Sequence, residues 1–63
     1  MKVYKIRRIS DGMYFYYVTR DVNGFDEDGH AYTYPNVALD YAALVDHDEE
    51  YEIVEFDLVE VKS

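Results

Sequence analysis

The stretch "KVYKIRRISDGMYFYYVTR" (residues 2–20) decides the fold. Its first half alternates apolar Tyr4 and Ile6 with charged neighbours, which is the pattern of a half-buried strand. The "SDG" that follows is a tight-turn signal, because Asp and Gly tolerate the backbone angles that a hairpin turn needs. The aromatic and β-branched residues 13–20 are typical of a returning strand. We therefore predict a β-hairpin over residues 2–20.

The rest of the chain predicts one helix and one further strand. Residues 21–36 read as a loop with a second small turn at Asp28-Gly29. The 3.6-residue period that follows predicts a short helix near 37–46, with Asn36 as its N-cap. Alternation returns at residues 51–61, which we predict to be the last strand. The expected fold is α+β in the order β-β-α-β: a small antiparallel sheet with the helix packed on one face.

The same patterns predict which side chains are buried. One face of the helix carries large apolar residues, which we assign to the core; they are Val37, Tyr41, Leu44 and Val45, with Ala38 and Ala42 beside them. In the last strand, Val54, Phe56 and Leu58 share one face, which we also assign to the core. The other face, with Tyr51 and Ile53, is apolar as well.

The "YFYY" of residues 14–17 places aromatic rings on both faces of one strand. If Phe15 and Tyr17 face the helix, then Tyr14 and Tyr16 point away from it. Two explanations stay open for these outer rings. They lie flat against their own chain, or they meet a partner, since tyrosine is enriched in interface cores.

Composition limits the stability of a chain of 63 residues, which we expect to fold as one domain over residues 1–63. Such a chain buries only about 60% of the surface that its unfolded form exposes. It contains no cysteine, so disulfides and thiolate metal sites are excluded. Oligomerisation is the remaining common device for stabilisation, and we expect a homodimer formed through the sheet.

Charge is distributed unevenly along the chain. Residues 1–20 carry a formal charge of +4 and residues 21–63 carry −12, for a total of −8. One interpretation is that the basic first strand pairs with the acidic last strand inside the fold, with Lys2, Lys5 and Arg7 facing acids across the ladder. The other is an acidic surface directed at a basic partner. The two are compatible.

No motif predicts catalysis, a metal or a cofactor. Residues 21–32 fail the EF-hand pattern at three positions, because Phe25, Asp26 and Tyr32 stand where ligands and a glycine are required. His30 and His47 have no converging ligands and are expected at the surface. Direct nucleic-acid binding is disfavoured by the acidic field. No apolar run approaches the roughly 20 residues that span a bilayer, and we expect a cytoplasmic protein that is not an enzyme.

Three stretches, "YKIRRISDGMYF", "GFDEDGHAY" and "YEIVEFDLVEV", resemble a group of small bacteriophage and prophage proteins. Those proteins often open with an "IR-x-x-x-x-G-x-F" hairpin, continue through an aromatic-x-x-x-Gly-x-x-aromatic turn and a helix, and close with "EIVEFEL"-like residues. The residues that carry the resemblance are Ile6, Arg7, Gly12, Phe25, Gly29, Tyr32 and residues 53–58. The group tends to have lysines in the turn where this chain has Asp26, Glu27 and Asp28. The resemblance implies no activity. It implies an origin in a phage, where small acidic proteins frequently bind and block a host protein.

These observations favour a small acidic binding protein that occupies a basic surface of a host or phage protein, with its carboxylates imitating the phosphates of nucleic acid. The partner would then be a nucleic-acid-binding protein. Two alternatives stay open: a structural or accessory module whose acidity serves only solubility, and a dimeric small-molecule-binding protein. The residues expected to contact the partner are Asp26, Glu27, Asp28, Asp46, Asp48, Glu49 and Glu50, with Tyr14, Tyr16 and Tyr34 as aromatic anchors.

Overall fold

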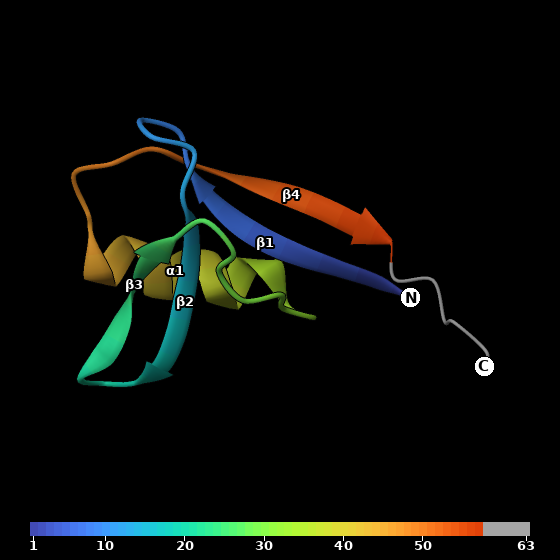
Figure 1. The fold of residues 1–63 in the computed structure, drawn as a ribbon, viewed down its shortest axis with the longest axis horizontal. Helices are drawn as coiled ribbons and strands as arrows, with labels where there is room; N and C mark the ends of the chain where they lie inside the picture. Colours follow the sequence, from blue (N-terminus) through green and yellow to red (C-terminus); the bar gives the residue numbers. More distant parts are fainter. Residues whose placement is uncertain (58–63) are drawn as a thin grey trace.

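A computed structural model describes residues 1–57 of this protein. It is an α+β fold with a four-stranded antiparallel sheet in the order β3-β2-β1-β4 and one helix on one face, as Figure 1 shows. The predicted class is confirmed, but the element order is β-β-β-α-β. The elements are β1 (Lys2–Arg8), β2 (Tyr14–Thr19), β3 (Val22–Asp26), α1 (Pro35–Val45) and β4 (Tyr51–Asp57). Leu58 and the predicted end of the last strand lie outside the described residues.

The predicted hairpin between β1 and β2 is confirmed. The N–H of Arg8 donates to the carbonyl of Met13, and the N–H of Gly12 donates to the carbonyl of Arg8, each at 2.8 Å. Gly12 has a φ of 73°, which glycine adopts without the steric cost that other residues meet. The carboxylate of Asp11 accepts the N–H of Met13 at 3.1 Å and closes the turn.

Strand β3 was predicted as part of a loop, and that prediction is wrong. The segment pairs with β2 in an antiparallel ladder that places Gly24 opposite Tyr16 and Phe25 opposite Phe15. Asn and Gly have low strand propensity, so the local sequence disfavours a strand. The Tyr16 ring compensates by packing on Gly24, where a Cβ would meet the tyrosine hydroxyl oxygen at 3.3 Å. Pairing with an aromatic strand therefore overrides local propensity.

Strand β4 pairs with β1 along its whole length, as predicted, from Lys2 opposite Asp57 to Arg8 opposite Tyr51. Two of the three expected opposite-charge contacts form, whereas Lys5 is opposite Val54 and its Nζ donates to the backbone carbonyl of Asp28 at 2.7 Å. Lys2 Nζ lies 3.6 Å from a Glu55 carboxylate oxygen, and Arg7 pairs with Glu52. These side chains are largely exposed, so each pair contributes less than about 1 kcal/mol. Their main effect is to favour this register over its neighbours.

Strands β1 and β2 separate after one paired position, Arg7 opposite Tyr14. The segment around Tyr32 enters the gap, where it exchanges backbone hydrogen bonds of 2.7 and 2.8 Å with Tyr4. In Figure 1 the β1–β4 ribbon and the β2–β3 hairpin therefore diverge from a common end, with this segment between them. The helix packs on aromatic side chains from these diverging parts of the fold.

The core lies between the sheet and α1. Its buried members are Ile6, Phe15, Ala38 and Ala42, with Tyr17, Phe25, Tyr32, Leu39 and Tyr51 packed against them. Phe15 and Tyr17 belong to this cluster, as predicted for the helix-facing side of β2. Phe15 is at the centre, with ring centroids of Phe25 and Tyr32 at 5.4 and 6.2 Å.

The predicted buried face of the helix is wrong. Ala38 and Ala42 are 4% and 0% exposed, whereas Leu44 is 77% exposed, and Val37, Tyr41 and Val45 are exposed as well. Aromatic rings from the sheet already fill the space beneath the helix, so the small Ala38 and Ala42 allow the backbone of α1 to approach, with Leu39 partly buried beside them. The helix also begins one residue before Asn36. Tyr34 is the N-cap residue and makes no side-chain cap hydrogen bond, and Pro35 occupies the first turn, a position that suits proline.

The face assigned to β4 is reversed. Ile53 is opposite Ile6, so Tyr51 and Ile53 share the helix side of the sheet. Val54 and Phe56 lie on the outer side, and Phe56 is 38% exposed. Both faces of this strand are apolar, so alternation alone does not decide which one packs on the helix. Among residues 1–57, no helix is long and apolar enough to cross a membrane.

Candidate protein-binding surfaces

The fold brings three connections to one end of the molecule. Strands β1 and β3 and helix α1 end there, while β2 and β4 begin there. The N–H of Ile9 donates to the carbonyl of Glu50 at 2.9 Å and joins the first connection to the last. We call this region, residues 9–12, 26–29 and 46–50, the acidic end. Its carboxylates are Asp11, Asp26, Glu27, Asp28, Asp46, Asp48, Glu49 and Glu50, and it contains no Lys or Arg.

Arg8 links these connections from the end of β1. Its guanidinium contacts Asp11 at 2.6 Å and Asp46 at 3.0 Å, and its central carbon lies 4.2 Å from the centroid of the Phe25 ring. The hydrogen bond from Arg8 lowers the pKa of Asp11 below its usual value. The same bond is the largest cause of a raised pKa for Arg8. Arg8 therefore stays charged and neutralises part of the negative charge of the acidic end through Asp11 and Asp46.

Tyr51 completes this support. Its ring stacks on Phe25, with centroids 5.7 Å apart and planes 9° apart, and its hydroxyl donates to the carbonyl of Asp46. Burial, followed by the nearby charge of Asp46, raises the pKa of the Tyr51 phenol. The connection that follows α1 is therefore held by both a side-chain ion pair and a backbone contact.

The predicted acidic contact residues divide into two groups. Asp26 and Asp46 are used inside the fold: the Asp26 carboxylate accepts the N–H of Asp28 at 3.0 Å and that of Gly29, and Asp46 pairs with Arg8. The other predicted acids have no ion pair among residues 1–57; they are Glu27, Asp28, Asp48, Glu49 and Glu50. In the described part of the chain, no three of the Asp, Glu and His side chains form a group that could hold a metal ion.

The predicted aromatic anchors do not lie together. On the outer sheet face, Tyr14 makes an edge contact with Phe56 at 6.4 Å, and Lys5 Nζ lies 5.2 Å from the Tyr14 ring centroid. The 26–29 turn folds back on Tyr14, leaving no room for a Cβ at Gly29. Tyr16 packs on Gly24 and against His30. Their own chain therefore covers much of both rings.

Tyr34 is 74% exposed and lies at the opposite end of α1 from the acidic end. It begins a row of exposed apolar side chains, and the sequence analysis placed the other three members of that row in the core. We call this row the helix stripe: Tyr34, Val37, Tyr41 and Leu44. The 3.6-residue period identified Val37, Tyr41 and Leu44, but their exposure was decided by which face of the helix packs on the sheet.

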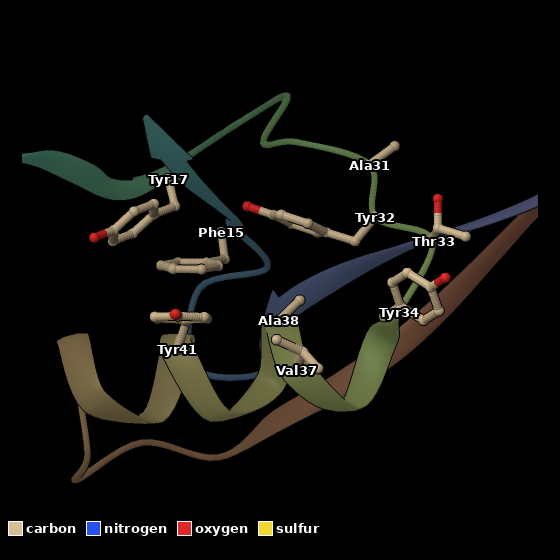
Figure 2. A pocket seen from close by; sticks show the side chains of 9 residues that line it. All are labelled: Phe15, Tyr17, Ala31, Tyr32, Thr33, Tyr34, Val37, Ala38 and Tyr41. Atoms are coloured by element: carbon tan, nitrogen blue, oxygen red, sulfur yellow. The ribbon is translucent and has the colours of Figure 1, made fainter. Parts of the chain in front are cut away.

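A pocket adjoins the helix stripe, and Tyr34, Val37 and Tyr41 belong to both (Figure 2). Its volume is about 430 Å³. It is lined by Phe15, Tyr17, Ala31, Tyr32, Thr33, Tyr34, Val37, Ala38 and Tyr41. The Tyr32 hydroxyl oxygen is buried without a hydrogen-bond partner in the described structure. Burial raises the pKa of the Tyr32 phenol. The nearby Tyr17 backbone partly offsets this rise, although it does not form a hydrogen bond with the hydroxyl. The sequence interpretation did not identify this pocket, because Tyr17 and residues 31–34 come together only in the fold.

Comparison of the chain with family models, with curated proteins and with solved structures gives no match.

Proposed function

We propose that this protein binds a partner protein by placing its acidic end on a basic surface of that partner. The observation that carries the proposal is that five carboxylates without an ion pair among residues 1–57 lie on two connections at the same end of the fold. Acidic residues that served only solubility would have no reason to collect at one end of so small a fold. A concentrated field of one sign steers an oppositely charged partner and selects against the wrong ones.

The way the acidic end is built supports binding to a protein and not to a metal ion. Asp26 and Asp46 hold their connections in shape, so the free carboxylates of their neighbours are displayed on ordered backbone. Ordering before binding reduces the entropy lost on association. A basic groove that normally holds nucleic acid is the partner surface that such a group of carboxylates fits best. In a phage-encoded protein, that partner would be a host or phage protein in the host cytoplasm.

The test compares charge removal at the acidic end with equal charge removal elsewhere. One variant carries Glu27→Gln and Asp28→Asn, and a second carries Asp48→Asn and Glu49→Gln. The matched control carries Asp21→Asn and Asp40→Asn, two exposed acids outside the acidic end. Tagged forms are used to capture proteins from a bacterial lysate at low and high salt, and captured proteins are identified by mass spectrometry.

We expect the wild type and the control to capture the same basic protein, and the two acidic-end variants to lose most of it. Capture by the wild type should weaken as salt screens the charges. DNA or RNA should displace the captured protein if its basic groove normally binds nucleic acid. Equal capture by all four forms would show that the carboxylates serve solubility, as in the accessory-module alternative.

A further inference from the structure

The helix stripe is an uncharged apolar surface that residues 1–57 leave exposed. Tyr34 and Leu44, at its two ends, are 74% and 77% exposed, and Val37 and Tyr41 between them are 55% and 47% exposed. Successive members are three, four and three residues apart, which is the spacing of a coiled-coil seam. Apolar rows of this kind on a small acidic protein mark a contact surface.

We propose that a second copy of this chain covers the stripe, with the two α1 helices antiparallel about a two-fold axis. The spacing is the reason for choosing this occupant. The spacing of the four positions is symmetric about position 39. An antiparallel pair therefore places Tyr34 beside the partner's Leu44, and Val37 beside the partner's Tyr41. A two-fold contact requires such a self-complementary surface.

The pocket gives this arrangement its second reason. Tyr34 and Val37 line the pocket at the beginning of α1. In the antiparallel pair, the Leu44 side chain of each copy lies over this part of the other copy's pocket. Each copy therefore supplies a side chain to a hollow that is incomplete without it. Leu44 has no other apolar surface to cover within the described structure, where it is the most exposed large apolar residue of α1.

Charge supplies the third reason. The first turn of α1 has no acidic residue and no side-chain cap, so the positive end of its helix dipole is not neutralised by its own helix. In the antiparallel pair, the acidic connection that follows the partner's Leu44 approaches this positive end. The net charge of −8 on each copy opposes association over longer distances. We therefore expect the dimer to become stronger as added salt screens this repulsion.

The first experiment measures mass by analytical ultracentrifugation from about 5 to about 500 μM, because contact along one short helix belongs to the small, weak class of interfaces. We expect a monomer–dimer equilibrium that shifts toward the dimer between about 50 and about 500 mM salt. A monomer at every concentration and at both salt levels overturns the proposal.

Variants then locate the interface. Leu44→Asp should reduce dimer formation at least tenfold and leave the circular dichroism of the monomer unchanged, because Leu44 is exposed in the monomer. The matched control is Val18→Asp, which places the same charge at a residue that is 60% exposed on β2, away from the stripe. Val18→Asp should dimerise like the wild type. A dimer that survives Leu44→Asp, or that Val18→Asp weakens equally, overturns the assignment to α1.

Cross-linking tests the antiparallel direction, and it is unambiguous because the chain has no native cysteine. Chains with Tyr34→Cys are mixed with chains with Leu44→Cys and oxidised. We expect the mixed disulfide to form in large excess over disulfides within either population. A parallel pair would instead join each variant to its own kind and would contradict the proposal. Dimerisation and capture of a basic protein respond to salt in opposite directions, so one can fail while the other holds.

Discussion

The two sides of helix α1 differ in a way that a hydrophobicity pattern does not predict. The side against the sheet carries Ala38 and Ala42, and the neighbouring side carries the helix stripe with its larger apolar residues. If burial of apolar area alone decided the packing, the large residues would face the sheet. The sheet surface is already filled by aromatic rings around Phe15. The comparison teaches that available space, and not hydrophobicity, selects the packed side of this helix.

The largest effect should come from the centre of the packed side. Phe15→Ala should lower the free energy of unfolding by about 3–5 kcal/mol, because it removes a fully buried ring and leaves a cavity. That is about the whole stability expected of a core this small. Urea titration followed by circular dichroism at low protein concentration measures the change. Leu44→Ala on the stripe is the control and should stay within about 0.5 kcal/mol of wild type. If Leu44→Ala is as destabilising as Phe15→Ala, the stripe belongs to the core.

A smaller effect should follow from enlarging the packed side. Ala42→Leu should cost about 1–3 kcal/mol, because Ala42 is 0% exposed and extra methylene groups force the helix away from the sheet. Val37→Leu adds one methylene group on the exposed stripe and should change stability by less than about 0.5 kcal/mol. Thermal unfolding of both variants checks the pair. Stabilisation by Ala42→Leu would mean that the helix does not pack closely on the sheet.

Two phenols beneath the helix should respond differently to loss of the hydroxyl, with a loss of stability only at Tyr51. Tyr51→Phe removes the donor to the Asp46 carbonyl and should cost about 0.5–1.5 kcal/mol. Tyr32→Phe removes a buried hydroxyl without a partner and should leave stability unchanged or raise it by up to about 1 kcal/mol. Urea titrations near pH 7 compare the two. A loss from Tyr32→Phe as large as that from Tyr51→Phe would indicate a hydrogen bond to the Tyr32 hydroxyl.

The smallest effect should be a pH dependence at the acidic end. The pKa of Asp11 is lowered in the folded protein by its hydrogen bond from Arg8. Its contribution to stability is therefore present above the unfolded pKa of about 3.9 and is lost as the pH falls through the lowered folded value. Asp11→Asn should unfold with a flatter pH dependence in this acidic range, as thermal melts between about pH 2 and pH 5 would measure. Identical profiles for the two proteins would rule out this contribution.

The sequence predicted those parts of the structure in which local pattern and local chemistry agree. The 2–20 hairpin follows from alternation around Asp11 and Gly12, and both turn residues have the predicted role. The pairing of β4 with β1 follows from charge, as Arg7 and Glu52 demonstrate. The acidic connections were found as segments. Their gathering at one end was not, because it depends on the direction of every strand and of the helix.

The sequence by itself determined the fold class, the hairpin, the presence of one helix and the pairing of the first and last strands. Local periodicity and turn residues specify the first three, and opposite charges on the two strands specify their pairing. Only the tertiary structure decided that β3 is a strand, that Ile53 and not Phe56 faces the helix, and that Leu44 is exposed. Strand β3 forms because it pairs with the aromatic β2, where the Tyr16 ring packs on Gly24. Strand β4 and helix α1 each carry apolar residues on two sides, and the space left by the packed rings around Phe15 selected the side that is buried.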